Sequence, residues 1–380
     1  MKLFDVYPLF DIEPFGAQGL WLWDKAGTRY LDLYGGHAVI SIGHSHPHYV
    51  KQLTGQAARI GFYSNSVKIS LQEELAEKLG ELSGYSGYSL FLCNSGAEAN
   101  ENALKLASFH NGRKKIIAFS GAFHGRTSLA VAATDDSAIS APVNGTGNVL
   151  FLSFNDGQAL EAHMDESVCA VIVEGIQGVA GVRVASEGFL KTIRSVCDQW
   201  GAMMILDEVQ SGYGRSGRFF AHQYAGAQPD LITVAKGMGN GFPVGGVLIS
   251  PRFQARQGML GTTFGGNHLA CAAGIAVLDV IREEGLVQRA LETGSYIMDQ
   301  VKRLEGVREV RGRGLMIGIE LEFACAALRK RLLFEERIFT GSASDKNTIR
   351  ILPALNIKRE EADIFLHALN KVLKSQKQTA

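Results

Sequence analysis

The stretch MMILDEVQSGYGRSGRFFAHQYAGAQPDLITVAKG, residues 203–237, contains two short apolar runs, and a charged residue follows each of them. Asp207 comes directly after Met203–Leu206, and Lys236 comes one alanine after Leu231–Val234. Runs of this kind, which do not alternate with polar residues, are typical of strands that are buried on both faces of a sheet. A carboxylate or an ammonium group at the end of such a strand is costly to bury unless it is paired or used chemically.

Five other runs are similar to these two. Helical patterns separate several of them, because apolar residues recur at helical spacing over Ala97–His110 and again over Gly188–Trp200. Strands that alternate with helices predict an α/β fold with a mostly parallel sheet, and the runs together predict seven strands. The five runs are Tyr88–Leu92, Ile116–Phe119, Val149–Phe154, Val168–Val173 and Gly246–Ile249.

The last third of the chain has a different pattern, with long helical stretches and few consecutive buried strands, so it predicts a smaller α+β domain. The hairpin expected at Trp21–Leu33 could pair with this domain. We therefore predict a large domain over residues 45–265 and a small domain made of residues 1–44 and 266–380. The stretches expected in the last third are helices at Leu269–Ile281, Leu286–Leu304 and Arg359–Leu373, and strands within Val307–Glu322 and Thr348–Leu355.

The composition disfavours several classes of protein. Lys and Arg number 38 together, as do Asp and Glu, so the net charge is zero and no nucleic-acid partner is expected. No apolar run approaches the roughly 18 residues of a membrane span, and the acidic N-terminal stretch does not resemble a signal peptide. The 5 cysteines stand singly, so neither a disulfide framework nor a metal site is expected, and a cytoplasmic location fits best. The 44 glycines are a larger share of the 380 residues than the usual ~7%. This excess indicates tight turns and places where the backbone comes close to other groups.

Ligands of open α/β sheets bind at the carboxyl ends of the strands, so the residues that follow each strand are the candidates for chemistry. Ser95–Ala97 stand at a helix start, where free N–H groups suit a phosphate, but alone they more often form an ordinary helix cap. Phe123 alone is more often a core residue, and His124 alone is more often a local hydrogen-bonding group. Taken alone, Asp207 could simply cap the segment that follows it, and Lys236 could extend its amine to solvent.

In combination, these residues match the requirements of pyridoxal phosphate. That cofactor needs a lysine for a Schiff base, a carboxylate facing its pyridine nitrogen, a helix N-terminus for its phosphate, and apolar groups on both ring faces. Lys236, Asp207, Ser95–Ala97, and Phe123 with Val209 can supply these from one edge of one sheet. Dinucleotide and P-loop nucleotide sites are not supported, because neither GxGxxG after the first strand nor GxxxxGK[ST] occurs.

The chain resembles the class III (subgroup II) pyridoxal-phosphate-dependent aminotransferases, and most closely the acetylornithine and succinylornithine aminotransferases. The joint match of DEVQ, GxGR and AKG, with Asp207 and Lys236 29 residues apart, is highly specific, and the resemblance covers nearly the whole chain. It implies fold type I of the pyridoxal-phosphate-dependent transferases and a homodimer whose sites are shared across the interface. The matching stretches are LDLYGGHAVISIGHSHPHYV (31–50), FLCNSGAEANENALKLA (91–107), GAFHGRTSLA (121–130), VEGIQGVAGV (173–182), ILDEVQSGYGRSG (205–217), TVAKGMGNGFPVGG (233–246) and TTFGGNHLACA (262–272).

The resemblance also implies roles for single residues around pyridoxal 5'-phosphate. Lys236 would form the Schiff base and carry protons, and Asp207 would pair with the pyridine nitrogen. The other expected contacts are phosphate binding by Gly96 and Ala97 with Ser95 nearby, ring packing by Phe123 and Val209, a contact from Gln210 to the phenolic oxygen, and a contact from Thr263 to the neighbouring subunit's phosphate.

The implied reaction moves the terminal amino group of an N-acylornithine to 2-oxoglutarate, giving N-acylglutamate semialdehyde and glutamate in arginine biosynthesis. Arg126 would bind the α-carboxylate of the acylated ornithine, and Thr262 would lie in the substrate pocket. Arg350 would bind the α-carboxylate of glutamate, because the planar guanidinium suits bidentate contact with a carboxylate.

The chain departs from the family pattern at Val179, where many relatives have a glutamate that pairs with the glutamate-binding arginine. The masking of Arg350 would therefore differ, and a preference for succinylornithine over acetylornithine is one hypothesis. Within the class, the alternatives are ornithine δ-aminotransferase, 4-aminobutyrate aminotransferase and glutamate-1-semialdehyde aminomutase. From a different class, the alternative is a catalytically silent protein that binds pyridoxal phosphate, which intact Lys236 and Asp207 disfavour.

Overall fold

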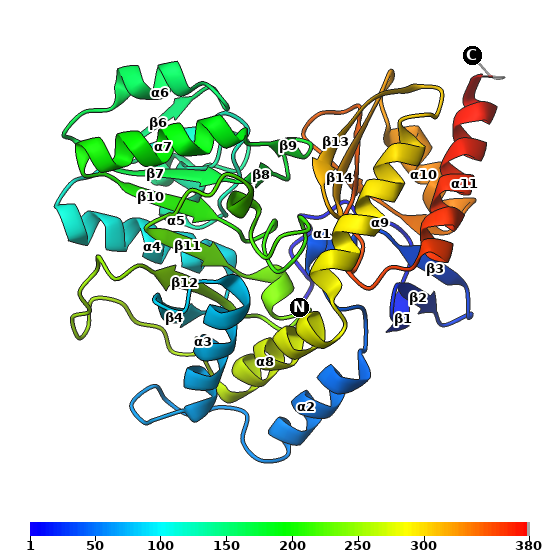
Figure 1. Ribbon diagram of the computed structural model, residues 1–380. Coiled ribbons are helices and arrows are strands. Elements are labelled where there is room, and N and C mark those ends of the chain that lie inside the picture. The colour runs from blue at the N-terminus through cyan, green and yellow to red at the C-terminus, as the bar shows by residue number, and fades with distance from the viewer. Residues whose placement is uncertain (378–380) are drawn as a thin grey trace.

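The computed structural model describes residues 1–377, and a seven-stranded sheet occupies one half of the molecule (Figure 1). The strand order is β4-β12-β11-β10-β7-β5-β6, and all neighbouring pairs are parallel except the two that include β12. The predicted α/β fold with a mostly parallel, seven-stranded sheet is confirmed. The strands are β4 (Ser89–Cys93), β5 (Lys115–Phe119), β6 (Val149–Leu152), β7 (Val168–Glu174), β10 (Met203–Asp207), β11 (Leu231–Val234) and β12 (Gly245–Ile249).

The largest difference between a predicted and an observed strand of this sheet is at β6. It ends at Leu152 instead of Phe154, because the carbonyl of Ser153 accepts a turn hydrogen bond of 3.3 Å from the amide of Asp156. The ring of Phe154 then packs edge-on against Phe189 at a centroid distance of 5.7 Å. The apolar run therefore continues into a core contact after the strand itself has ended.

Alternate residues of the central strand β10 enter two different hydrophobic clusters. Met203 and Ile205 pack with helix α4 (Gly96–Asn111), whereas Met204 and Leu206 pack with helix α7 (Glu187–Trp200). Both faces of the sheet are therefore covered, which explains why the strand is apolar at every position except its last. Burial at about 25 cal/mol per Å² of apolar surface makes these two clusters the main source of stability on this side of the molecule.

The other half of the molecule contains two four-stranded sheets, with the orders β1-β2-β3-β15 and β13-β14-β17-β16. The predicted hairpin is β2 with β3, and it pairs with the C-terminal part of the chain, because Leu31 lies opposite Ile338. The domain boundaries at residues 45 and 265 remain a prediction. The elements here are β1 (Pro14–Gln18), β2 (Trp21–Asp24), β3 (Arg29–Asp32), β13 (Val307–Arg313), β14 (Met316–Leu321), β15 (Ile338–Phe339), β16 (Gly341–Ser342), β17 (Thr348–Ile351), α8 (His268–Glu283), α9 (Leu286–Val301), α10 (Ala326–Phe334) and α11 (Arg359–Lys377).

Several shorter elements were not predicted from the sequence. Two of them, α2 (Pro47–Ala57) and α3 (Ser70–Ser83), pack against α8 below the large sheet in Figure 1. The same holds for β1, α10, β15 and β16 and for α1 (Gly35–Ala38), α5 (Ser128–Ala132), α6 (Gly157–His163), β8 (Ile176–Gln177) and β9 (Arg183–Val184).

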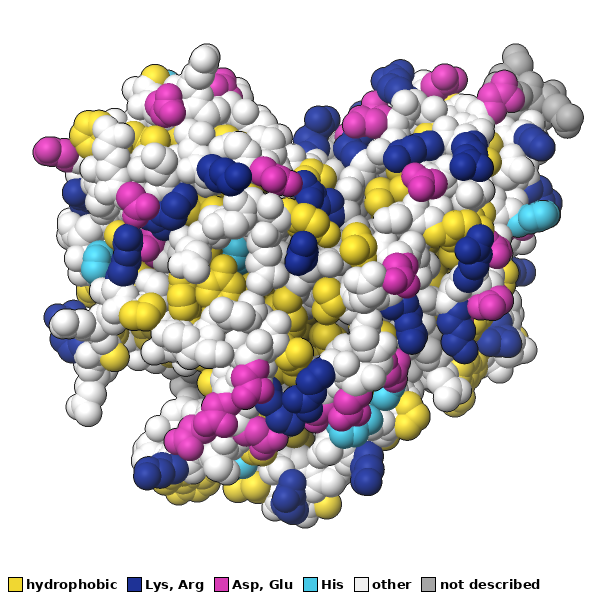
Figure 2. All heavy atoms as spheres, in the orientation of Figure 1, with side chains coloured by type: hydrophobic (Ala, Val, Ile, Leu, Met, Phe, Trp, Pro, Cys, Tyr) yellow, Lys and Arg dark blue, Asp and Glu magenta, His cyan; other side chains and the backbone are white. Residues whose placement is uncertain are grey.

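The face of the molecule in Figure 2 carries Lys and Arg side chains interspersed with Asp and Glu side chains. A surface of mixed sign produces no strong field over a long distance, which agrees with a net charge of zero. Within residues 1–377, no helix is both long enough and apolar enough to cross a bilayer.

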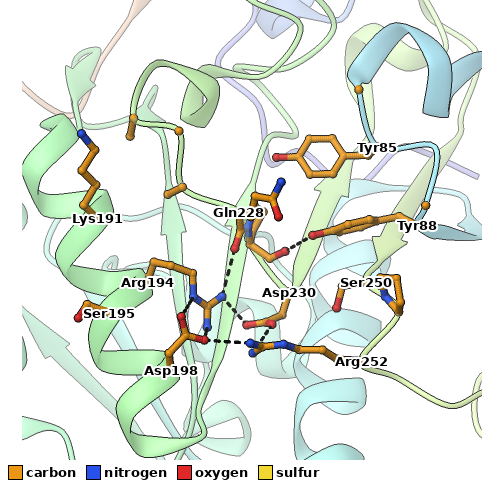
Figure 3. Close-up of a pocket in the computed structure, with 17 residues that line it drawn as sticks. Tyr85, Tyr88, Lys191, Arg194, Ser195, Asp198, Gln228, Asp230, Ser250 and Arg252 are labelled. Carbon is orange, nitrogen blue, oxygen red and sulfur yellow. Dashed lines mark hydrogen bonds and ion pairs between the residues drawn. The ribbon is translucent and has the colours of Figure 1, made fainter.

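A hollow of about 820 Å³ lies at the amino edge of strands β10 and β11 (Figure 3). Its floor is a ring of four charged side chains, in which Arg194 and Arg252 each contact both Asp198 and Asp230 at 2.7–3.0 Å. Asp230 also accepts the amide of Met204 at 2.8 Å. The two positive and two negative charges of this ring neutralise one another, so the ring joins α7 to the sheet and its own charges are already paired.

We predict that Asp230→Ala lowers the free energy of unfolding by about 3 kcal/mol, because it removes one of the two carboxylates that Arg194 and Arg252 share and leaves the buried Met204 amide without its acceptor. The control is Asp299→Ala, which removes an exposed 3.5 Å pair with Lys302 and should change stability by less than about 0.5 kcal/mol. Urea unfolding followed by circular dichroism measures both. Equal losses in the two variants would contradict a structural role of the ring.

Candidate active site

A cavity of about 410 Å³ lies at the opposite, carboxyl edge of the large sheet. Its walls come from the residues that follow β4, β5, β7, β10 and β11, the edge where α/β sheets bind ligands. Most of the site residues predicted from the sequence line this cavity, although they are far apart in the chain. Ser95 and Lys236, for example, are 141 residues apart. Those in the wall are Ser95, Gly96, Ala97, Phe123, Arg126, Asp207, Val209, Gln210 and Lys236.

Asp207 is the last residue of the central strand, and its side chain is buried. Its Oδ2 accepts hydrogen bonds from Asn100 Nδ2 and His124 Nδ1, both at 2.8 Å, and its Oδ1 accepts the amide of Val209 at 3.0 Å. Three donors from three different segments therefore hold the carboxylate in one orientation. Such contacts compensate the large cost of removing a carboxylate from water.

Two of these donors were missed as functional residues. The sequence predicts His124 to be a local hydrogen-bonding group, but it contacts Asp207, 83 positions away. Burial lowers the pKa of His124, but the hydrogen bond and charge of Asp207 outweigh burial and leave the pKa raised. Asn100 lies on the buried face of α4 and also bonds the His124 carbonyl at 2.7 Å and the Thr233 hydroxyl at 2.7 Å. An asparagine on the apolar face of a predicted helix was the signal that could have identified it.

Lys236 follows β11 and lines the same cavity as Asp207. Its backbone φ is +44°, in the left-handed region that residues other than glycine rarely occupy, so the surrounding structure holds it in a strained position. Its ε-amine forms no ion pair with any of residues 1–377, and burial lowers its pKa although the charges of Asp207 and Glu174 oppose that effect. An unpaired amine with a lowered pKa is suited to act as a nucleophile and a base.

The first turn of α4 forms another part of the cavity wall. Ser95 caps the helix by accepting the amide of Glu98 at 3.2 Å, while the amides of Gly96 and Ala97 come before any helical carbonyl that could accept them. A Cβ on Gly96 would lie only 2.7 Å from Val209 Cγ1, so glycine is required there for the helix end to approach the wall. This part of the cavity can hold an anion such as a phosphate.

Phe123 and Glu174 complete the wall. The guanidinium of Arg126 lies 6.0 Å from the centroid of the Phe123 ring, and the amide of Phe123 donates to Glu174 Oε1 at 3.0 Å. Burial is the main cause that raises the pKa of Glu174 to about 7, and the adjacent Asp207 charge adds to it. Besides Asp207, the site therefore contains the Glu174 carboxyl, and the protonation of Glu174 changes near neutral pH.

Three predicted residues lie outside the cavity wall. Thr262 adjoins the cavity through Asn94, whose Nδ2 lies 3.3 Å from the Thr262 hydroxyl, and Thr263 is exposed. Arg350 is buried beside Tyr34, and its charge contributes to lowering the pKa of Lys236. Within residues 1–377, no group of three or more His, Cys, Asp or Glu side chains forms a candidate metal site.

Comparison with known proteins gives one family. The model of the family "Aminotransferase class-III" matches residues 8–373. The acetylornithine aminotransferase of Archaeoglobus fulgidus is 42% identical over 350 residues, which is 91% of this chain and 92% of that protein. Acetylornithine aminotransferase 1 of Bordetella bronchiseptica is 38% identical over 386 residues, which is 98% of this chain and 97% of that protein.

Solved structures of aminotransferases have the same fold. The ornithine aminotransferase of Toxoplasma gondii superposes with a TM-score of 0.93 at 28% identity, over 100% of this chain and 94% of that one. The acetylornithine aminotransferase of Elizabethkingia anophelis superposes with a TM-score of 0.84 at 29% identity, over 98% of this chain and 95% of that one. Backbone similarity does not separate the two substrates, because substrate choice depends on side chains in the site.

The raised pKa of Glu174 predicts a dependence of stability on pH. The folded protein keeps a proton on this carboxyl up to a pH of about 7, whereas the unfolded chain releases it near 4.5. The contribution of Glu174 to stability is therefore present at low pH and lost as the pH rises from 4.5 to about 7.

In protein without added cofactor, Glu174→Gln should weaken the fall of Tm between about pH 5 and pH 8, because glutamine accepts the same hydrogen bond without titrating. Differential scanning fluorimetry of both proteins across this pH range measures the effect. Glu161→Gln, at an exposed position of α6, is the control and should leave the profile unchanged. If the Glu174→Gln profile matched the wild-type profile, this carboxyl would not be the titrating group.

Proposed function

The chain belongs to the class-III aminotransferases, and on that premise we propose that it moves the terminal amino group of an N-acylornithine to 2-oxoglutarate with pyridoxal 5'-phosphate as cofactor. The products are an N-acylglutamate semialdehyde and glutamate, and the reaction serves arginine biosynthesis. The observation that carries the proposal is the convergence of Lys236 and the buried Asp207 carboxylate in one cavity with the free end of α4.

The cavity has the donors that this cofactor requires. Its volume of about 410 Å³ lies in the range of small-molecule sites, and its wall offers a helix N-terminus and a lysine. Phe123 and Val209 offer apolar surface for the ring, and Gln210 Oε1 is a buried acceptor without a partner. When bound, pyridoxal phosphate supplies an aldehyde that accepts amino groups and a ring that withdraws electrons.

The chain's own residues would divide the remaining work. Lys236 would hold the aldehyde carbon and, once released, would move a proton to and from the substrate carbon that bears the amino group. Asp207 would keep a proton on the pyridine nitrogen, and its three hydrogen bonds fix it for that contact. The Gly96 and Ala97 amides would bind the phosphate, with the positive end of the α4 dipole behind them.

Two arginines would select the substrates. Arg126 lies in the wall beside Phe123 and would bind the α-carboxylate of the donor, with Thr262 near the mouth. Arg350 is buried and its Nη1 has no hydrogen-bond partner, which leaves it available for a carboxylate of 2-oxoglutarate or glutamate. The relatives with the highest identity above are acetylornithine aminotransferases, which favours an acylated donor over free ornithine.

The enzyme would act as a homodimer in the cytoplasm. Phe62 and Phe264 form an exposed aromatic pair with a centroid distance of 5.4 Å, and exposed Tyr63 and Thr263 stand beside them in sequence. Exposed aromatic groups of this size are typical of protein interfaces, and Thr263 would reach from there to the partner's phosphate. All cysteines are free and buried, which agrees with a reducing compartment.

The proposed reaction is tested with a panel of donors. Acetylornithine, succinylornithine, ornithine and 4-aminobutyrate are each offered with 2-oxoglutarate, and glutamate is measured. We expect the acylated ornithines to give kcat/KM at least about tenfold above the others, and Lys236→Ala to abolish turnover. Activity without 2-oxoglutarate, or normal turnover by Lys236→Ala, would contradict the proposal.

The shared site is tested by mixing two inactive variants. Lys236→Ala removes the essential amine, and Thr263→Glu places a negative charge at the expected phosphate contact. If Thr263 acts across the interface, each hybrid dimer has one intact site, so refolding the two variants together should restore about a quarter of wild-type activity. No recovery, in a mixture shown to contain hybrids by native mass spectrometry, would place Thr263 in its own subunit's site or outside any site.

A further inference from the structure

The backbone at Gly35–Ala38, labelled α1, forms one left-handed turn. The φ angles of Gly35, Gly36, His37 and Ala38 are +56°, +54°, +68° and +65°. The turn is closed by a 2.9 Å hydrogen bond from the amide of Ala38 to the carbonyl of Tyr34. A left-handed conformation costs about 1–2 kcal/mol per non-glycine residue, so His37 and Ala38 occupy unfavourable positions. Strain that a fold maintains is often located at functional sites.

The turn places His37 between the cavity and Arg350. The His37 carbonyl accepts a 3.1 Å hydrogen bond from Nε2 of Gln210, which lines the cavity. On its other side, His37 Nδ1 lies 2.5 Å from the Tyr34 hydroxyl, and the same hydroxyl lies 3.1 Å from Arg350 Nη2. Three side chains from two segments more than 300 residues apart therefore form one hydrogen-bonded relay.

The donors in this relay can be assigned from chemistry. A guanidinium only donates, so the Tyr34 oxygen accepts from Arg350, and the Tyr34 proton is then free to be given to His37 Nδ1. His37 must be neutral to accept it, and burial with the positive charges of Arg350 and Lys236 lowers its pKa. The relay thus holds Arg350 through a neutral phenol and a neutral imidazole.

Arg350 has no carboxylate partner among residues 1–377. Its other polar contact is with the Ser342 carbonyl, and Nη1 is buried without a partner. Val179, which lines the cavity, supplies no negative charge. A buried guanidinium that is oriented but not neutralised is a site prepared for an incoming carboxylate.

We propose that His37 is a positioning residue for the dicarboxylate acceptor: through Tyr34 it orients Arg350, and the strained turn exists to place its Nδ1. The inference rests on the proposed function, because it assigns Arg350 to the carboxylate of the 2-oxo acid. His37 itself does not contact the substrate, and its effect is on binding of the acceptor, not on the donor.

The strain and the side chain can be separated by two substitutions. His37→Gly removes the imidazole and relieves the left-handed strain, so it should raise Tm and yet weaken acceptor binding about tenfold. His37→Asn keeps an acceptor atom at the same distance from the backbone and tolerates the left-handed region, so it should bind nearly as the wild type does. If His37 had only a structural role, His37→Gly would raise Tm and leave acceptor binding unchanged.

The experiment measures binding of glutarate, which has both carboxylates but no keto group, by isothermal titration calorimetry. In parallel, turnover gives one KM value for the keto-acid acceptor and another for the acetylornithine donor, and only the value for the acceptor should rise in His37→Gly. The control is Arg337→Gly, at another left-handed residue (φ +60°) far along the chain, which should leave glutarate binding unchanged.

A double-mutant cycle then tests the relay itself. Tyr34→Phe should weaken glutarate binding about as much as His37→Gly, and the double variant should be no weaker than either, because both remove the same contact. Additive losses, a His37→Asn variant as weak as His37→Gly, or unchanged binding in His37→Gly would overturn the inference. If the wild-type protein transfers amino groups to 2-oxoglutarate but the His37 variants bind glutarate normally, only this inference fails. If the wild-type protein does not transfer amino groups to 2-oxoglutarate, the proposed function fails too.

Discussion

The hydrogen bonds that Asp207 accepts join three segments that the chain brings from far apart. Asn100 comes from the first turns of α4, His124 from the loop after β5, and Asp207 from the end of β10. Burying a carboxylate without partners costs several kcal/mol, so these contacts must form together with the fold for the strand to end where it does. The free helix end and the strained Lys236 are then positioned by the same packing that buries this carboxylate.

The two edges of the large sheet show how polar groups distinguish a structural hollow from a functional one. At the amino edge, the charged groups of Arg194, Arg252, Asp198 and Asp230 satisfy one another and, among the described lining side chains, only the neutral Ser250 hydroxyl is buried and unpartnered, although that hollow is the larger of the two. At the carboxyl edge, the Lys236 amine, the His124 Nε2 and the Gln210 Oε1 lack partners within the described chain. Polar atoms that a fold buries and leaves unpaired indicate a ligand more strongly than volume does.

The large sheet could be predicted because its strands are buried on both faces, so each appears as an unbroken apolar run that ends in a polar residue. The same pattern is sufficient to predict that Asp207, Lys236 and Ser95–Ala97 share one edge of the sheet. The turn at Gly35–Ala38 could not be predicted, since four left-handed residues have no periodic signal and only two of them are glycines. The contact of Tyr34 with Arg350 could not be predicted either, because it depends on how the short strands pair and not on a local motif.

With an apolar Val179 instead of a glutamate at this position, the electrostatic problem at Arg350 differs from that of a guanidinium paired with a carboxylate. A carboxylate partner would neutralise the guanidinium when the acceptor is absent, but it would have to move away before the acceptor could bind, at a cost in affinity. A neutral tyrosine and histidine fix the direction of the guanidinium without placing a carboxylate in contact with it, so no such movement is needed. The desolvation of Arg350, which lowers the pKa of its guanidinium, is instead compensated by hydrogen bonds to Tyr34 and the Ser342 carbonyl. The left-handed turn serves both contacts, because it brings the His37 imidazole to the tyrosine while the His37 carbonyl holds Gln210 at the cavity wall.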